Sequence, residues 1–168
     1  MYLIEKMKKI IIVRHAKSTW TEQVNDHERG LKNRGFKDAE LVSMKFKELN
    51  LVPDKLISST AKRAKLTAEI FIKNLNISPN KLCFDKNLYD FSGENLVETI
   101  KNTEVNIETL MVFGHNHALT NFANDFGDRY IENVSTSGLV VLDFHVDSWN
   151  YIFKGNTIHI IFPRDLKS

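Results

Sequence analysis

The chain has 168 residues, the usual size of one domain, and 42% of them are hydrophobic against 26% charged, which is a globular composition. Its 23 basic and 21 acidic residues leave a formal net charge of +2, so composition gives no reason to expect nucleic acid as a partner. We expect a single domain over residues 1–168, in which residues 1–6 form an N-terminal extension if Met7 is the true start.

The first predicted element is a strand at about residues 9–14, which follows basic residues in the segment MYLIEKMKKIIIV. Its uninterrupted apolar run is only four residues long and ends at Arg14, which is too short for a signal peptide or a membrane span. We therefore expect neither, and we expect no membrane partner. A fully apolar strand of this kind is typical of a sheet that is covered on both faces.

A helix is predicted at residues 35–49, a short strand at 55–58 and a second helix at 60–74. Apolar residues recur at helical spacing in both helices, and this pattern predicts one buried face on each. For the first helix the predicted buried residues are Phe36, Ala39, Leu41, Val42, Phe46 and Leu49. For the second they are Ala64, Ala68, Phe71 and Leu75.

A third predicted strand, at residues 82–86, contains the single cysteine, Cys83. One cysteine cannot form an internal disulfide, and its apolar neighbours predict a buried thiol. We therefore expect the reducing environment of the cytoplasm. A helix follows Ser92, and strands are predicted at 109–114, 138–144 and 157–162. Another helix runs from about residue 117 to a stop at Gly127.

Strands and helices alternate along most of the chain, and the last part is rich in strands. This order predicts an α/β fold, a three-layer α/β/α sandwich whose central sheet is mostly parallel, with antiparallel strands added late. In such sheets ligands bind beyond the carboxyl ends of the strands. Two apolar runs end there, one in Arg14-His15 and the other in Gly114-His115. We expect these two histidines to meet at one site.

The start of the helix at 60–74 carries Lys62, Arg63 and Lys65, at the end where the helix dipole disfavours cations. An anion bound there would explain the charges, because helix N-terminal N–H groups and a guanidinium fork suit a phosphoryl group. We expect Arg63 to bind phosphate and the two lysines to be solvated. Thr60 is expected to cap the helix.

Several segments together resemble a known family: RHAKSTW, DHERGLKNRG, PDKLISSTAKRAKLTAEI, LYDFS, VFGHN, FHVDSW and FPRDL. They are similar to the histidine phosphatase (phosphoglycerate mutase-like) superfamily, in particular to its short SixA-like phosphohistidine phosphatase branch. The resemblance runs from about Lys9 to Leu166. It implies the phosphoglycerate mutase-like fold and one histidine phosphatase domain over residues 1–168.

The resemblance implies that His15 is the nucleophile that becomes phosphorylated, and that Arg14, Arg63 and His115 complete the phosphate pocket. A neutral imidazole attacks phosphorus well when one ring nitrogen is held by a hydrogen bond and the other is free. His115 would donate a hydrogen bond or positive charge to the phosphoryl oxygens. Neither a metal ion nor a cofactor is expected.

A proton donor for the leaving group is less well defined. Asp90 stands where the wider superfamily carries its general acid, and Glu94 follows closely. In the alternative interpretation, Asp90 caps or turns the chain and Glu94 favours the first turn of the helix after Ser92. A phosphohistidine substrate would relax the need for a donor, because imidazole is far less basic than an alkoxide.

Two further phosphate-binding candidates are Ser18 and Asn116, although Ser18 could serve a local loop contact and Asn116 could cap a helix. Arg29 and Arg34 are expected to be solvated rather than part of the pocket. Two imidazoles in the pattern His115-x-His117 could bind zinc, but no cluster of cysteines or carboxylates accompanies them. His27, His145 and His159 are expected to be loop or surface residues without a chemical role.

The connections that follow His15, Arg63 and His115 leave little room for a lid. An open pocket could admit a phosphorylated side chain of another protein. We therefore expect a metal-independent, cytoplasmic phosphatase that acts in signalling. It would remove phosphate from protein phosphohistidine and release it as inorganic phosphate. The alternatives are a small-molecule phosphomonoesterase of the same superfamily, or a non-catalytic phosphate-binding signalling module.

Overall fold

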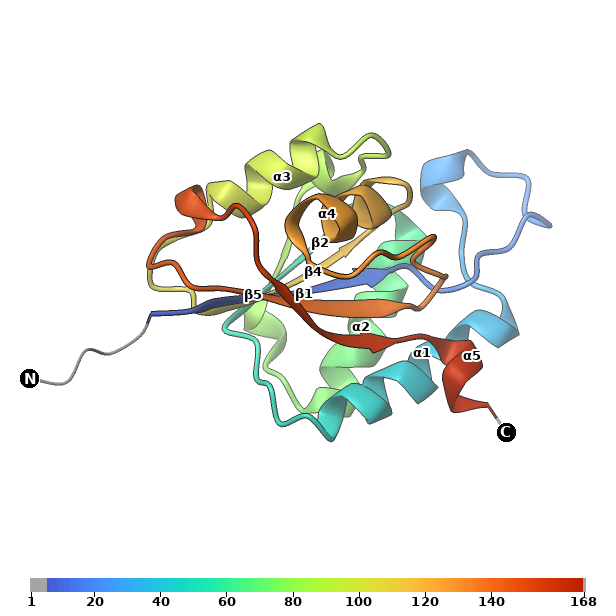
Figure 1. Ribbon diagram of the computed structural model, residues 1–168. Coiled ribbons are helices and arrows are strands. Elements are labelled where there is room, and N and C mark those ends of the chain that lie inside the picture. Colours follow the sequence, from blue (N-terminus) through green and yellow to red (C-terminus); the bar gives the residue numbers. More distant parts are fainter. Residues whose placement is uncertain (1–5, 168) are drawn as a thin grey trace, which may run out of the picture.

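A computed structural model describes residues 6–167 and shows a six-stranded sheet between two layers of helices (Figure 1). The proposed N-terminal extension, residues 1–6, lies outside the described residues except for Lys6. The strands are β1 (Lys8–Arg14), β2 (Lys55–Ser58), β3 (Leu82–Phe84), β4 (Thr109–Gly114), β5 (Leu139–Phe144) and β6 (Asn156–Ile161). Their order across the sheet is β3-β2-β4-β1-β5-β6.

The sheet is parallel in its first part and antiparallel at its end. Strands β3, β2, β4 and β1 pair in parallel, whereas β5 is antiparallel to both β1 and β6. This arrangement confirms the expected three-layer fold with antiparallel strands added late. Because β1 and β4 lie side by side with Arg14 opposite Gly114, the residues that follow these two strands emerge next to each other.

The longer helices are α1 (Asn33–Lys47), α2 (Lys62–Leu75), α3 (Glu94–Lys101) and α4 (Ala118–Phe126). A short α5 (Pro163–Leu166) and four 3-10 turns, which the sequence did not predict, complete the set: η1 (Asp26–Glu28), η2 (Pro79–Lys81), η3 (Lys86–Leu88) and η4 (Trp149–Tyr151). Helices α3 and α4 cover one face of the sheet, and α1, α2 and α5 cover the other (Figure 1). Within residues 6–167, no helix combines the length and apolar character needed to cross a membrane.

Strand β1 contributes side chains to the hydrophobic core on both faces of the sheet. Ile10 and Ile12 pack in the cluster beneath α3 and α4, while Ile11 and Val13 pack in the cluster beneath α1 and α2, and all four are fully buried. Side chains alternate between the two faces of a strand, so a continuous apolar run is what a sheet covered on both sides requires. The strand is thereby fixed in place, and with it the residues at its end.

Some local predictions of burial and capping were wrong. Cys83 is exposed, because β3 is a three-residue strand at the edge of the sheet. Phe36 and Leu41 are exposed on α1, whereas Ala39, Val42 and Phe46 are buried as expected. 

Thr60 does not cap α2. The N-cap position belongs to Ala61, which makes no side-chain capping bond. The Thr60 hydroxyl instead forms a 2.8 Å hydrogen bond with Nε2 of His27. This bond ties the start of α2 to η1, in the connection between β1 and α1.

Candidate active site

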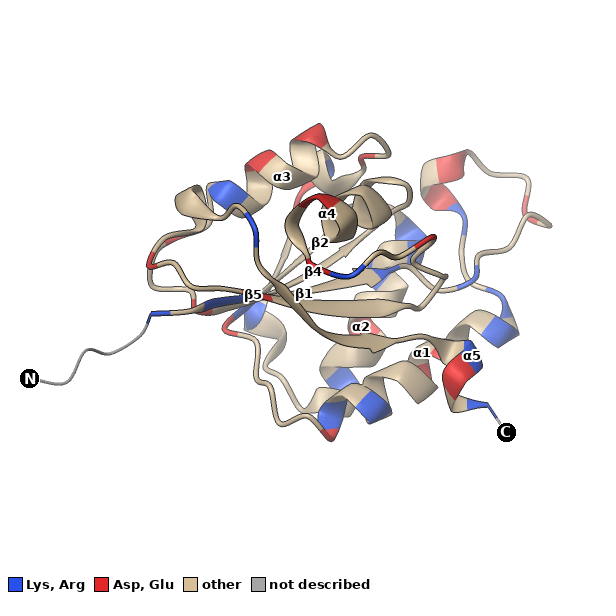
Figure 2. Ribbon diagram, in the orientation of Figure 1, with Lys and Arg blue, Asp and Glu red and all other residues tan. Residues whose placement is uncertain are grey.

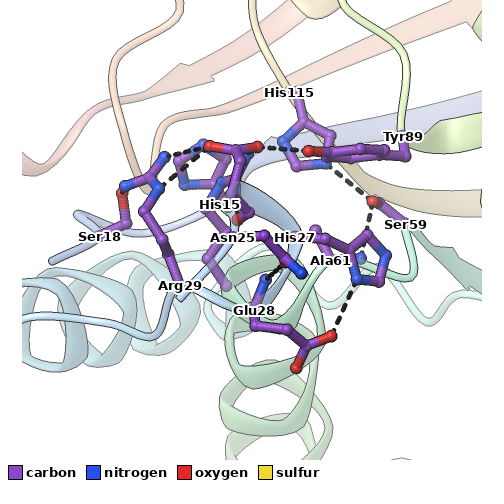
Figure 3. A network of polar contacts seen from close by, with 12 residues as sticks. His15, Ser18, Asn25, His27, Glu28, Arg29, Ser59, Ala61, Tyr89 and His115 are labelled. Carbon is purple, nitrogen blue, oxygen red and sulfur yellow. Dashed lines mark hydrogen bonds and ion pairs between the residues drawn. The ribbon is translucent and has the colours of Figure 1, made fainter. Parts of the chain in front are cut away.

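A pocket of about 470 Å³ lies at the carboxyl ends of β1 and β4, beside the start of α2. Six of the seven predicted site residues line it: Arg14, His15, Ser18, Arg63, His115 and Asn116. The rings of His15 and His115 lie side by side with their centroids 5.2 Å apart (Figure 3). The two histidines, a hundred positions apart in the sequence, therefore face one cavity.

His15 is held in a defined tautomer. Its Nδ1 lies 2.8 Å from the carbonyl oxygen of Ala16, and since a carbonyl can only accept, Nδ1 carries the proton and Nε2 keeps its lone pair. The backbone is fixed as well, because the amide of Ala16 donates to the Thr67 hydroxyl. Burial lowers the pKa of His15 well below its usual value; the Ala16 bond partly opposes this, and the positive charges nearby lower it further. The ring is therefore neutral near pH 7.

His115 is buried against Ser59, the residue that follows β2. Its Nε2 lies 2.8 Å from the Ser59 hydroxyl, which also accepts a bond from the amide of Ala61. Burial, followed by the charge of Arg63, lowers the pKa of His115 to about 3. Its Nδ1 is buried and has no hydrogen-bond partner among the described residues. When the Ser59 hydroxyl donates to Nε2, Nδ1 carries the ring proton and is free to donate.

The two arginines also hold unpartnered donors. Arg14 gives one hydrogen bond of 2.9 Å to the carbonyl of Val134, and Arg63, only 2% exposed, gives two to Asp26. The Nε of each guanidinium is buried and, within the described chain, has no partner. A buried donor left unsatisfied costs about 1–3 kcal/mol. Arg14, Arg63 and His115 line one cavity, and guanidinium and imidazole N–H groups gathered in this way suit an oxyanion.

Asp26 and Tyr89 belong to the site, although the sequence reasoning did not select them. The carboxylate of Asp26, on η1, pairs with Arg63 and Arg29 at 2.9 and 3.1 Å and accepts a short hydrogen bond from the Tyr89 hydroxyl. Burial acts to raise the pKa of Asp26, but the bonds from Tyr89 and Arg63 outweigh it and hold the pKa below its usual range. Asp26 is therefore ionised and fixes the fork of Arg63. The spacing of Asp26 and Arg29 in the segment DHERG was the available signal.

Arg29 was expected to be solvated, and this prediction was wrong. Its side chain is 8% exposed, lines the pocket and donates to the Ser18 hydroxyl at 2.6 Å and to Asp26. Arg34, by contrast, is exposed and pairs with the buried carboxylate of Asp38 on α1. The difference arises because Arg29 lies in the connection that folds back over the pocket, whereas Arg34 lies on the first turn of a helix.

The connection between β1 and α1, residues 15–32, forms much of the pocket lining. Lys17, Ser18, Trp20, Asp26 and Arg29 all line the cavity from this one segment. Figure 2 shows residues of both charges along this connection, and Lys and Arg at the start of α2. Among the residues that line the cavity, basic side chains outnumber acidic ones, which raises the local concentration of anions.

Asp90 lies outside the pocket lining, and its environment is the reverse of what a general acid requires. Its carboxylate accepts hydrogen bonds from the amides of Ser92, Gly93 and Leu96 and from the Ser92 hydroxyl. Burial acts to raise the pKa of Asp90, but these bonds lower it overall. The carboxylate thus caps the start of α3, as the alternative interpretation held. Glu94 occupies the first turn of that helix.

Asn116 lines the pocket, but its side chain serves α4. Its Oδ1 accepts bonds from the amide and hydroxyl of Thr120, and its Nδ2 donates to Asn133. His117, at the N-cap of α4, is exposed. Within residues 6–167, no group of three or more His, Cys, Asp or Glu side chains is gathered so that it could hold a metal ion.

His27 lies nearer the site than expected. Its ring centroid is 5.0 Å from that of Tyr89, and its Nε2 bond to Thr60 links η1 to α2. His145 is exposed and His159 is half-buried, and both lie away from the pocket lining. Figure 3 shows His27 and Ser59 on the same side of the site. The polar network around the pocket thus extends through η1 to the start of α2.

Comparison with known proteins identifies the family. The model of the histidine phosphatase superfamily (branch 1) matches residues 10–94, which is half of the chain and includes His15 and Arg63. The chain therefore belongs to the histidine phosphatase superfamily, and the resemblance drawn from the sequence is confirmed.

Relatives and solved structures agree with this assignment. An uncharacterized protein of Mycobacterium tuberculosis is 28% identical over 141 residues, which cover 77% of this chain and 85% of that protein. The fold is similar to that of the protein histidine phosphatase SixA complexed with tungstate, with a TM-score of 0.80, 17% identity and coverage of 95% and 99% of the two chains. A phosphoglycerate mutase from Bacillus anthracis gives a TM-score of 0.63, 14% identity and coverage of 88% and 96%.

Proposed function

We propose that this protein is a metal-independent phosphatase that works through a phosphohistidine intermediate on His15. The observation that carries the proposal is the state of His15: its Nδ1 is held by Ala16, and its Nε2 lone pair is free. Arg14, Arg63 and His115, all of which carry N–H donors, line the same cavity. Phosphoryl transfer depends mainly on such positioning and on electrostatic stabilisation.

In the first step, the Nε2 lone pair of His15 attacks phosphorus, and the bond between phosphorus and the leaving group breaks. The leaving group departs with the bonding pair, and His15 keeps its proton on Nδ1. Arg14, Arg63 and His115 donate to the non-bridging oxygens as charge spreads over them. In the second step water attacks the phosphorus, the pair of the P–N bond returns to His15, and the protons of water pass to inorganic phosphate and solvent.

Protein phosphohistidine is the proposed substrate because the pocket favours a leaving group that needs no proton from the enzyme. Asp90 caps a helix, and the pocket carboxylate Asp26 is ionised and engaged by Arg63, Arg29 and Tyr89. Phosphohistidine protonated on its far ring nitrogen leaves as neutral imidazole. The similarity in fold to the protein histidine phosphatase SixA points in the same direction.

Turnover by the purified protein tests the proposal. A histidine-phosphorylated protein, 4-nitrophenyl phosphate and glycerol phosphate would be compared in buffer with EDTA, with His15→Ala as the control. We expect rapid release of phosphate from the phosphoprotein, slower release from the aryl ester, slowest from the alkyl ester, and none with His15→Ala. Preference for small esters would instead indicate a phosphomonoesterase. Binding of phosphate without turnover would indicate a non-catalytic module.

A further inference from the structure

Two large aromatic side chains are exposed at the pocket. Trp20 is 73% exposed and Phe91 is 47% exposed, and both line the cavity that contains His15 and His115. Neither side chain is needed to hold an oxyanion, since Arg14, Arg63 and His115 supply the donors. Exposed apolar surface grouped at a cavity is typical of a ligand-binding wall. These rings would therefore contact the leaving group of the ligand and not its phosphoryl group.

Phe91 is held close to the reacting centre. Its ring centroid lies 5.2 Å from that of His115 and 5.2 Å from that of Tyr89. The backbone around it is anchored because Asp90, the residue before it, accepts bonds from Ser92, Gly93 and Leu96. The capping role of Asp90 thus also fixes the position from which Phe91 enters the pocket.

Trp20 packs against the side chain of Arg29. The guanidinium of Arg29 lies 3.5 Å from the centroid of a Trp20 ring, a distance typical of a cation–π contact. Arg29 is itself fixed by Ser18 and Asp26. The indole is therefore supported from one side, and most of its surface stays accessible.

Resting on the proposed function, we propose that Phe91 and Trp20 form the binding site for a flat aromatic leaving group. The site would select imidazole-linked and aryl-linked phosphoryl groups over those linked to a non-aromatic group. Aromatic rings in contact stabilise each other beyond the effect of simple burial, and the contact would form with the imidazole of phosphohistidine or the ring of an aryl phosphate. Selection then depends on the shape of the leaving group as well as on its basicity.

Four substrates separate the effect of the shape of the leaving group from the effect of its basicity. A histidine-phosphorylated peptide and phosphoramidate both carry a P–N bond, but only the peptide has a ring at that bond. Likewise 4-nitrophenyl phosphate and acetyl phosphate both have good oxygen leaving groups, and only the first is aromatic. The measured quantity is the ratio of kcat/KM for the ringed substrate to kcat/KM for the ringless substrate in each pair.

In Phe91→Leu and in Trp20→Leu we expect both ratios to fall by about 3- to 10-fold, and in Phe91→Tyr we expect them to stay near the wild-type values. Phe153→Leu is the matched control, because Phe153 is 73% exposed and lies outside the pocket lining. It should leave both ratios unchanged. Thermal unfolding of each variant would verify that it folds.

Uniform loss of activity on ringed and ringless substrates in Phe91→Leu, or ratios equal to those of the wild type, would overturn this inference and leave the proposed function standing. A wild-type protein that turns over none of the four substrates would overturn both.

Discussion

Two buried imidazoles lie among fixed cations in this pocket, and their neighbours assign them different tasks. The backbone carbonyl of Ala16 can only accept, so the proton of His15 is kept away from the attacking nitrogen. Ser59 can accept or donate, so His115 can place its proton on the unpartnered nitrogen. One ring is thus suited to attack and the other to donate, although both are neutral.

Arg63 is the residue whose replacement by lysine is most informative. Its two terminal nitrogens bond to Asp26, and its side chain lines the cavity. A lysine has one nitrogen and cannot both hold Asp26 and bind phosphate. We expect Arg63→Lys to lower kcat/KM by about 10²- to 10³-fold, measured with a histidine-phosphorylated protein. Activity within a few-fold of the wild type would mean that the planar fork is not required.

Asp26 should act by positioning rather than by proton transfer. Its carboxylate is 42% exposed, so its pairs contribute modestly, and we expect Asp26→Asn to lower the free energy of unfolding by about 1 kcal/mol at pH 7. Because the pKa of Asp26 is lowered in the folded state, this contribution is present above the unfolded pKa of about 4 and is lost as the pH falls below it.

Urea unfolding at several pH values would measure the difference in free energy of unfolding between the wild type and Asp26→Asn. It should shrink in acid. A difference that grows as the pH falls would contradict the assignment of Asp26 as an ionised partner of Arg63.

At the scale of elements, the start of α3 explains why the strongest sequence candidate for a proton donor does another job. Asp90 satisfies the amides of Gly93 and Leu96, which a helix start would otherwise leave without partners. We expect Asp90→Ala to lower the free energy of unfolding by about 1–2 kcal/mol.

A second variant, Asp90→Asn, distinguishes a cap from an acid through its kinetics. If Asp90 only caps α3, Asp90→Asn should lower kcat/KM for glycerol phosphate and for 4-nitrophenyl phosphate by the same factor. A much larger loss on the alkyl ester, whose leaving group needs a proton, would restore Asp90 as the general acid.

The regular elements could be predicted because local patterns decide them. The apolar run of β1 and the helical spacing of Ala64, Ala68 and Phe71 indicated their burial, and the ends of β1 and β4 indicated where the two histidines would meet. Cys83 was misjudged because its neighbours are apolar, yet whether a short strand lies at the edge of a sheet depends on the order of all the strands.

The walls of the site depend on long-range folding and were therefore missed. Asp26, Arg29 and Trp20 lie in an irregular connection without periodicity, and nothing local indicates that it folds back over the pocket. The partner of Asp26, Tyr89, is 63 positions away. Only the segments RHAKSTW and DHERG, noted for their family resemblance, and the candidate Ser18 pointed to this connection.

For the whole molecule, a site built on buried neutral histidines makes stability depend on pH. The pKa of His115 is lowered to about 3, whereas an unfolded histidine has a pKa of about 6.5. Between these values the unfolded state binds more protons, so stability falls as the pH drops below about 6.5.

We expect His115 to lower the free energy of unfolding by about 1.4 kcal/mol at about pH 5.5, relative to its value at about pH 7.5. Calorimetry at about pH 7.5 and pH 5.5 would compare the wild type with His115→Gln, in which the acid-dependent loss should be smaller by about that amount. An equal loss in both proteins would mean that His115 is protonated in the folded state.

The proposed mechanism requires one particular atom to carry the phosphoryl group. The protein would be mixed with a histidine-phosphorylated protein, quenched in alkali and digested, and the phosphorylated peptide would be examined by mass spectrometry and phosphorus NMR. We expect phosphate on Nε2 of His15, since Nδ1 is held by Ala16. Phosphate on Nδ1, on His115 or on any other residue would contradict it.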